Sequence, residues 1–171
     1  MTNGPETRAE ILRKRAARLS RAENTEPVVT DRVMIFKVAG EHYGLRIDCA
    51  SEVFTPDLIT PVPGSRPEIV GITNLRGEIV TVISLVGMLD AEAGSSDAGN
   101  HIIVAVAAEA TAGLLVDDIV GIFDIPADSI DPPLNTIAGK RAEYIVGECA
   151  WQDGLVGILD AAAILGSDSD E

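Results

Sequence analysis

Short apolar runs rich in Val and Ile recur between turn signals along most of the chain, at 33–39, 42–47, 79–85, 101–107, 112–116 and 155–160. Runs of this length and composition predict β-strands rather than helices. Within this region only brief stretches favour a helical turn, at 67–71, 127–130 and 161–165. The pattern therefore predicts an all-β body.

Residues 5–22 differ, because they are rich in Ala, Leu, Arg, Lys and Glu, which are strong helix formers. Thr7 and Glu10 have the spacing of a capping box at the start of a helix. A thin apolar stripe would follow one face of this helix, and we expect it to dock on the body or on a partner. The stripe consists of Ile11, Leu12, Ala16 and Leu19. We expect residues 1–31 to form this helix and a linker, 32–168 the folded domain, and 167–171 an acidic tail.

Two blocks of the body are repeated. "YGLRIDCASEVF" (43–54) aligns with "AGLLVDDIVGIF" (112–123) at an offset of 69 residues. "IVGITNLRGEIVTVIS" (69–84) aligns with "IVGECAWQDGLVGILD" (145–160) at an offset of 76 residues. A strand-rich repeat of this length predicts two similar small barrels that pack on each other.

The repeat isolates two charges in the first half. Where the first half has "NLRGE" (74–78), the second has "AWQDG" (150–154), so the turn forms without an arginine. Glu52 likewise has an uncharged counterpart, Gly121. Two opposite charges that are specific to the same half predict an ion pair between Glu52 and Arg76. The alternative is that each charge is solvated independently.

Charge and composition limit the classes of partner. The formal net charge is −14, and residues 31–171 carry −16 of it while residues 1–30 carry +2. Such an acidic body repels nucleic acid and anionic membranes, so we expect protein partners. No signal sequence or membrane-spanning run is apparent, and Cys49 and Cys149 are predicted to be buried free thiols. A cytoplasmic location is the simplest expectation.

The sequence contains no recognisable catalytic motif. His42 and His101 have no nearby ligand or catalytic partners in the sequence. Asp117 and Asp118 are adjacent in an apolar segment, but neighbouring strand residues point to opposite faces, which disfavours a shared site. The repeat partner of Asp117 is Asp48, which favours a role in capping a turn. We expect no enzyme activity, no metal and no cofactor.

The same segments, taken in order, resemble the CheW family of chemotaxis coupling proteins. They are "FKVAGEHYGLRIDCASEVF", "ITPVPGSRPEIVGITNLRGEIVTVISL", "GLLVDDIVGIFDIPADSIDPP" and "AEYIVGECAWQDGLVGILD". The most specific piece is the motif from Ile69 to Gly77 that contains "NLRG". The resemblance covers about residues 33–166.

The resemblance implies a fold of two five-stranded, SH3-like barrels on a shared core. The subdomains would span approximately 45–100, with exchanged strands, and 101–166. It also implies an adaptor between the cytoplasmic tips of methyl-accepting receptors and the regulatory domain of a CheA-like histidine kinase. The receptor-binding residues implied by the resemblance are Ile47, Ala50, Glu52, Val53, Gly71, Asn74, Leu75, Arg76 and Gly77.

Three alternatives remain open from the sequence. The first is a small-barrel protein that binds nucleic acid with a basic N-terminal arm, as some small barrels do. The second is a detached regulatory domain of a histidine kinase. The third is an acid hydrolase that uses Asp117 and Asp118.

Overall fold

The structure is a computed structural model, and it describes residues 7–22, 28–91, 101–135, 137 and 139–166. The strands of the first half are β1 (Thr30–Val38), β2 (Glu41–Arg46), β3 (Ala50–Phe54), β4 (Ile69–Leu75) and β5 (Glu78–Ser84). Those of the second half are β6 (His101–Ala107), β7 (Ala110–Val116), β8 (Asp118–Pro126), β9 (Ile145–Trp151) and β10 (Gly154–Leu159). The helices are α1 (Arg8–Ala22), α2 (Leu85–Met88), α3 (Arg141–Tyr144) and α4 (Ala161–Gly166), with single 3-10 turns η1 (Ile47–Cys49) and η2 (Ala127–Ser129).

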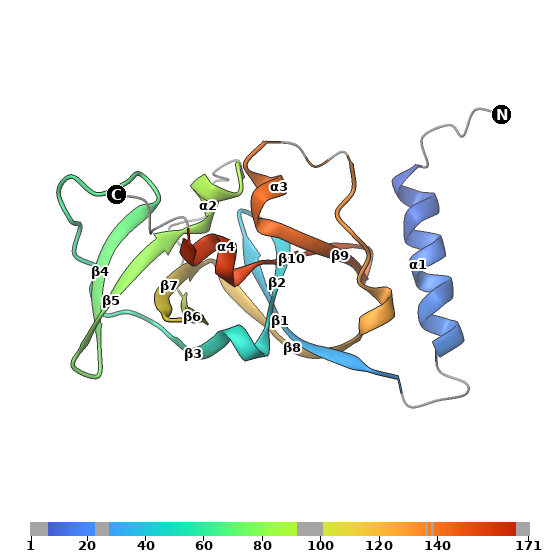
Figure 1. The fold of residues 1–171 in the computed structure, drawn as a ribbon, viewed down its shortest axis with the longest axis horizontal. Helices are drawn as coiled ribbons and strands as arrows, with labels where there is room; N and C mark the ends of the chain where they lie inside the picture. The colour runs from blue at the N-terminus through green and yellow to red at the C-terminus, as the bar shows by residue number, and fades with distance from the viewer. Residues whose placement is uncertain (1–6, 23–27, 92–100, 136, 138, 167–171) are drawn as a thin grey trace.

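The strands form two five-stranded sheets (Figure 1). Sheet A has the order β8-β1-β2-β10-β9, and sheet B has the order β3-β6-β7-β5-β4. The all-β class and the two similar halves are confirmed. The word barrel is too strong, because the outer strands of each sheet are not hydrogen-bonded to each other along their length.

Each sheet mixes strands from both halves of the repeat. The hairpin β1–β2 of the first half lies in sheet A with β8, β9 and β10, and β6–β7 of the second half lies in sheet B. The central parallel contact has the same register in both sheets. Ile158 is opposite Gly44 in sheet A, and Val82 is opposite Gly113 in sheet B. These two pairs are related by the 76- and 69-residue offsets, so the strand pairing confirms the repeat.

The core lies between the two sheets. Leu45 of sheet A and Leu114 of sheet B are fully buried in one cluster that draws residues from both halves. A smaller cluster around Val156 and Ile158 lies within sheet A. Burial of large aliphatic side chains at equivalent positions explains why both halves keep Val, Ile or Leu there.

Of residues 67–71, only Pro67 and Glu68 form a turn, which the Ile69 amide closes by donating to the Arg66 carbonyl oxygen (3.0 Å). They lead into β4, which begins at Ile69 and is rich in β-branched residues. The backbone of Thr60 pairs with Ile72 and passes directly over Gly71, where a Cβ atom would lie 2.3 Å from the Thr60 carbonyl oxygen. A glycine is therefore required at position 71 by the approach of another chain segment.

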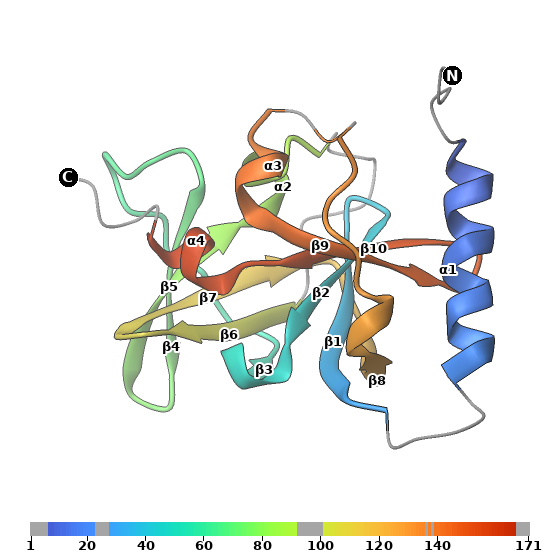
Figure 2. The same cartoon turned by 45° about the vertical axis from the view of Figure 1, so that its right-hand side comes forward.

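Helix α1 forms as predicted and begins with the expected capping box. The Thr7 amide donates to the Glu10 carboxylate (3.2 Å), and the Glu10 amide donates to the Thr7 hydroxyl (3.4 Å). The helix docks on β9 of sheet A and on the turn η2 (Figure 2). The predicted docking face is wrong in part, because Ala16 is exposed and Arg15 is the buried residue. The side chain of Leu19 and residues 167–171 lie outside the described part of the chain.

Candidate functional site

The "NLRG" segment forms the tight turn of the β4–β5 hairpin. Leu75 is paired with Glu78, which leaves Arg76 and Gly77 as the two turn residues. Both have positive φ angles, 52° and 89°, as a two-residue hairpin turn of type I′ requires. The Asn74 side-chain oxygen accepts a hydrogen bond of 2.9 Å from the Gly77 amide. These contacts fix the backbone from which the Arg76 side chain projects.

Arg76 forms an ion pair with Glu52, as the repeat comparison predicted. The guanidinium Nη2 lies 2.9 Å from the Glu52 carboxylate. Glu52 is on β3 and Arg76 follows β4, and these are the two outer strands of sheet B. Curvature of the sheet therefore brings its opposite edges together, and the ion pair spans the gap between them.

The Arg76 side chain is 80% exposed, whereas that of Glu52 is 26% exposed. Solvent screens a pair of this kind, so it contributes only about 0–1 kcal/mol to folding. An arginine has five N–H donors in a rigid fork, and the pair with Glu52 leaves most of them directed to solvent. The arrangement holds a guanidinium in a fixed place where another molecule can contact it.

Sheet A joins its outer strands by a different contact. Phe123 of β8 and Trp151 of β9 pack with ring centroids 4.2 Å apart and a tilt of 59°. At the turn, Gln152 occupies the position equivalent to Arg76 and has a similar φ of 49°. One half thus spans its outer strands with a half-buried aromatic pair, and the other with an exposed charge pair. The fold itself does not require Arg76.

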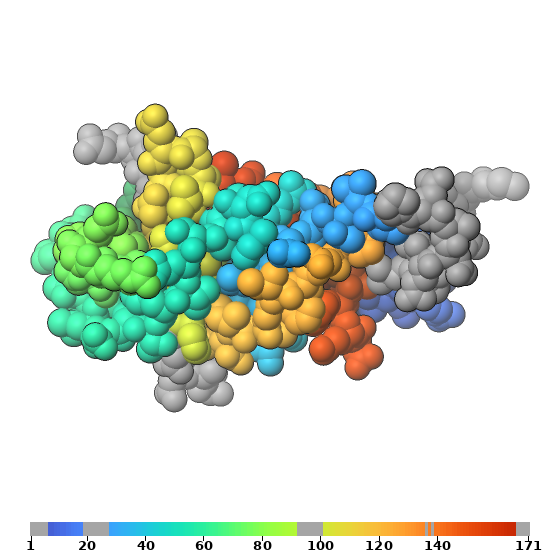
Figure 3. Space-filling view, turned by 90° about the horizontal axis from the view of Figure 1, so that it is seen from below, coloured from blue at the N-terminus to red at the C-terminus, as the bar shows by residue number. Residues whose placement is uncertain are grey.

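Exposed apolar side chains lie on β3, on β5 and on the segment that joins β3 to β4. Val53 is 37% exposed, Leu58 71%, Val62 38% and Ile79 65%. The Thr73 hydroxyl donates to the Leu58 carbonyl oxygen (2.7 Å), which holds the 55–62 segment against β4. In Figure 3 the green β4–β5 segments lie at one end of the molecule, and the turquoise segments extend from there toward its middle. Exposed apolar groups of this size around a fixed charge are typical of protein-binding surfaces.

The other predicted site residues either belong to the hairpin that carries Arg76 or pack within the body. Asn74, Leu75 and Gly77 belong to the hairpin that carries Arg76. Gly71 is buried beneath the Thr60 backbone, so its contribution is to the packing of β4. Ile47 and Ala50 are half-buried and pack against the shared core. Sequence reasoning missed the exposed Leu58 and Val62, which lie on the segment that folds against β4, and Ile79, which lies on β5.

The carboxylates of Asp117 and Asp118 accept hydrogen bonds from backbone amides. The Asp117 carboxylate accepts a hydrogen bond from the Ala39 amide (2.7 Å) in the β1–β2 turn. The Asp118 carboxylate accepts one from the Ile119 amide (2.9 Å). The predicted turn-capping role of Asp117 is therefore confirmed.

The described residues contain neither a metal-binding cluster nor a helix that could span a membrane. No group of three or more His, Cys, Asp or Glu side chains among them is arranged to hold a metal ion. None of the helices in that part of the chain is long and apolar enough to cross a membrane.

Comparison with known proteins identifies the family. The model of the CheW-like domain matches residues 32–169. The chain belongs to the CheW-like family. It is 27% identical over 140 residues to the chemotaxis protein CheW of Klebsiella aerogenes, with 82% of this chain and 84% of that protein covered. It is 31% identical over 113 residues to the protein FrzA of Myxococcus xanthus, with 66% and 69% covered.

A solved structure supports the same assignment. The scaffolding protein TtCheW of Thermoanaerobacter tengcongensis matches with a TM-score of 0.66 and 32% identity, over 77% of this chain and 90% of that one. Membership of the CheW-like family identifies the chain as an adaptor of chemotaxis-type signalling. These comparisons give no support to the nucleic-acid-binding, hydrolase or detached-kinase-domain alternatives.

Proposed function

We propose that the chain is a non-enzymatic, cytoplasmic adaptor that links the tips of methyl-accepting receptors to the regulatory domain of a CheA-like histidine kinase. The receptor binds the end of sheet B that carries Arg76, Glu52 and the exposed apolar residues around them. This assignment rests on one observation above the others. Arg76 is held by Glu52 at a turn that does not need it, and four-fifths of its side chain remains exposed.

The composition of this face suits a helical receptor tip. Apolar side chains such as Leu58 and Ile79 supply contact area, and burying each at an interface contributes up to about 1.5–3 kcal/mol. Arg76 supplies directed hydrogen bonds, which fix the register of the partner. A central arginine surrounded by apolar contacts is a common composition for a binding hot spot.

The proposal is tested by asking whether the chain bridges its two partners. A receptor cytoplasmic fragment and the kinase regulatory domain from the same cell are mixed with the chain, and the receptor is captured on beads. We expect the kinase domain to be retained only when the chain is present, and Arg76→Ala to lower its retention strongly. Retention that does not depend on the chain, or no retention with it, would contradict the proposal.

A further inference from the structure

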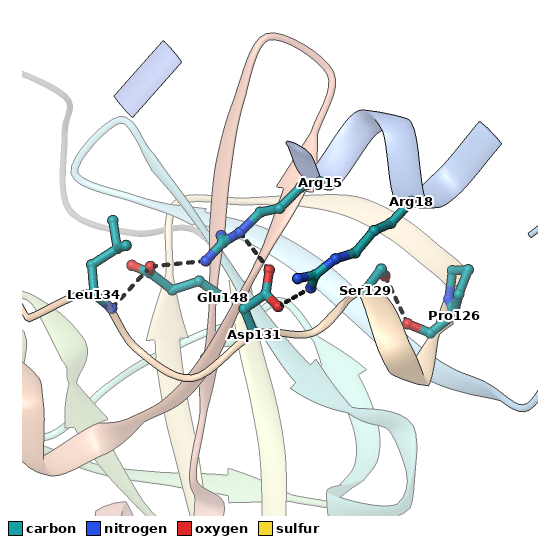
Figure 4. A network of polar contacts seen from close by, with 7 residues as sticks. All are labelled: Arg15, Arg18, Pro126, Ser129, Asp131, Leu134 and Glu148. Atoms are coloured by element: carbon teal, nitrogen blue, oxygen red, sulfur yellow. Dashed lines mark hydrogen bonds and ion pairs between the residues drawn. The ribbon is translucent and has the colours of Figure 1, made fainter. Parts of the chain in front are cut away.

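Helix α1 is attached to sheet A by one buried arginine. The Arg15 side chain is 4% exposed, and its Nε lies 2.6 Å from the Asp131 carboxylate (Figure 4). Its Nη2 lies 3.9 Å from the carboxylate of Glu148, which is 9% exposed. Arg18 forms a second, exposed contact of 2.7 Å to Asp131. The guanidinium of Arg15 thus sits between two carboxylates on the surface of sheet A.

The two carboxylates are placed by the body and not by the helix. The backbones of Asp131 and Glu148 exchange two hydrogen bonds of 2.8 Å, which fix the two residues side by side. The equivalent bridge in sheet B joins Thr60 and Ile72, which carry no charge. The acidic pair is therefore specific to sheet A, and the backbone bridge that places it involves no residue of α1.

Apart from Arg15, the described side chains of α1 from Arg8 to Arg18 are at most half-buried. Ile11 and Leu12 are half-buried, and the other described side chains from Arg8 to Arg18 are exposed, apart from Arg15. A hollow of about 1200 Å³ lies beside the first turns of the helix, between Arg8 and Ile11 and the 134–137 segment. Because these described side chains bury little apolar surface, their release exposes mainly charged groups, which water solvates well.

Helix α1 also has the composition to persist when released. It has 15 residues, begins with a capping box and is rich in strong helix formers. Helices of this length are marginal alone, so released α1 is helical for only part of the time. Release removes the guanidinium from between Asp131 and Glu148 and leaves two adjacent carboxylates that repel each other, although the Glu148 carboxylate keeps its hydrogen bond from the Leu134 amide (3.3 Å). The acidic pair therefore favours a replacement cation.

We propose that the Asp131–Glu148 pair is a docking site for an arginine on a basic helix of a partner protein, and that α1 is a built-in competitor for this site. The site lies on sheet A, at the opposite end of the molecule from the β4–β5 hairpin (Figure 1). It is therefore a second binding surface, and its existence does not depend on the receptor-binding role of Arg76. Docked α1 keeps this surface closed, and a partner helix opens it by displacing α1.

The test uses the full-length chain and a fluorescent peptide of residues 5–22 as the basic helix. Arg15→Glu releases α1 from the acidic pair by charge repulsion. We expect this variant to bind the peptide about 100-fold more tightly than the wild-type chain, in which the tethered α1 competes at millimolar effective concentration. Arg13→Glu makes the same charge change at an exposed position of α1, and it should behave like the wild type.

Two further measurements test whether the arginine itself is recognised, and a second variant is held in reserve. The peptide with Arg15→Ala should bind the released chain at least about tenfold more weakly, because charge-assisted contacts to both carboxylates are lost. Binding of the intact peptide should weaken as salt is raised. If Arg15→Glu does not fold by circular dichroism, Arg15→Ala in the chain replaces it in the same assay.

Four outcomes would overturn the proposal. Equal binding to wild type and Arg15→Glu would mean that α1 does not occupy the site in solution. Absence of binding to both would mean that there is no site. Equal binding of the two peptides would mean that the arginine is not recognised. A wild-type dimer that Arg15→Glu converts to a monomer would mean that α1 is exchanged between copies.

Discussion

Arg76 and Gln152 occupy the same position of the same hairpin turn in the two halves of the molecule, and both have a left-handed backbone, with φ of 52° and 49°. The Arg76 side chain reaches Glu52 at the opposite edge of its sheet, whereas Gln152 carries no charge for such an ion pair. Gln152→Ala therefore controls for the change in folding stability that comes from replacing a residue with this left-handed backbone, apart from the loss of the ion pair.

The first prediction concerns stability at this turn. Arg76→Ala removes an exposed ion pair, so we expect it to lower the free energy of unfolding by only about 0–1 kcal/mol. Gln152→Ala should cost a similar small amount. Chemical unfolding of the three proteins checks this, and a loss of several kcal/mol for Arg76→Ala alone would identify the ion pair as a structural requirement.

The second prediction concerns Gly71. A Cβ atom there would lie 2.3 Å from the carbonyl oxygen of Thr60, and a backbone atom cannot move aside as a side chain can. We expect Gly71→Ala to destabilise the fold by about 2–4 kcal/mol. Gly87→Ala is the control, since no atom lies within 4 Å of its added Cβ. Thermal unfolding measures both variants, and equal melting temperatures would contradict the close approach of Thr60 to β4.

The third prediction concerns the outer strands of sheet A. Phe123→Ala removes the partner of Trp151, and we expect a loss of about 1–3 kcal/mol. Trp151 is the only tryptophan in the chain, so its fluorescence reports this contact directly. Ile122→Ala is the neighbouring control at a 52% exposed position and should cost less than about 0.5 kcal/mol. An unchanged emission spectrum in Phe123→Ala would contradict the ring contact.

The fourth prediction concerns alkaline pH. Burial raises the pKa of the Cys149 thiol from 9.0 to about 11, and the carboxylates of Glu148 and Asp131 act in the same direction against Arg15. Because the folded state holds this proton more tightly, the stabilisation is complete below pH 9 and is lost as the pH rises to about 11. The expected loss is at most about 3 kcal/mol.

Tyr43 must be separated from Cys149 in this measurement. Burial also raises the pKa of the Tyr43 phenol, which therefore contributes to the same alkaline loss. Urea unfolding of the wild type and of Cys149→Ala between pH 8 and pH 11 isolates the thiol. We expect the difference in stability between the two proteins to shrink as the pH rises, and a constant difference would show that the thiol does not contribute.

The sequence was sufficient to predict the repeat and the Glu52–Arg76 pair, because both depend on comparing one half with the other. It was not sufficient to predict β4 from residues 67–71, where a helical turn was expected. The deciding contact is the passage of Thr60 over Gly71, which joins residues from separate segments. The sequence also predicted closed barrels. Whether the outer strands of a sheet hydrogen-bond to each other depends on contacts between distant segments, and here they do not pair along their length.

The docking of α1 shows a second limit of sequence patterns. An apolar stripe predicted that Ala16 would face the body, whereas the buried residue is Arg15. An arginine is rarely buried unless it is paired with carboxylates. Here the carboxylates belong to Asp131 and Glu148, which lie more than 100 positions from Arg15 in the sequence. Helical periodicity contains no information about such a distant partner.

A double-mutant cycle on receptor binding tests the central claim most directly. The affinity of a receptor cytoplasmic fragment is measured for the wild type, Arg76→Ala, Glu52→Ala and the double variant, with Gln152→Ala as the control. We expect Arg76→Ala to cost about 2 kcal/mol of binding free energy, or roughly 30-fold in affinity, and the double variant to lose less than the sum of the two. Gln152→Ala should bind as the wild type does. Unaltered receptor affinity in Arg76→Ala would contradict the account.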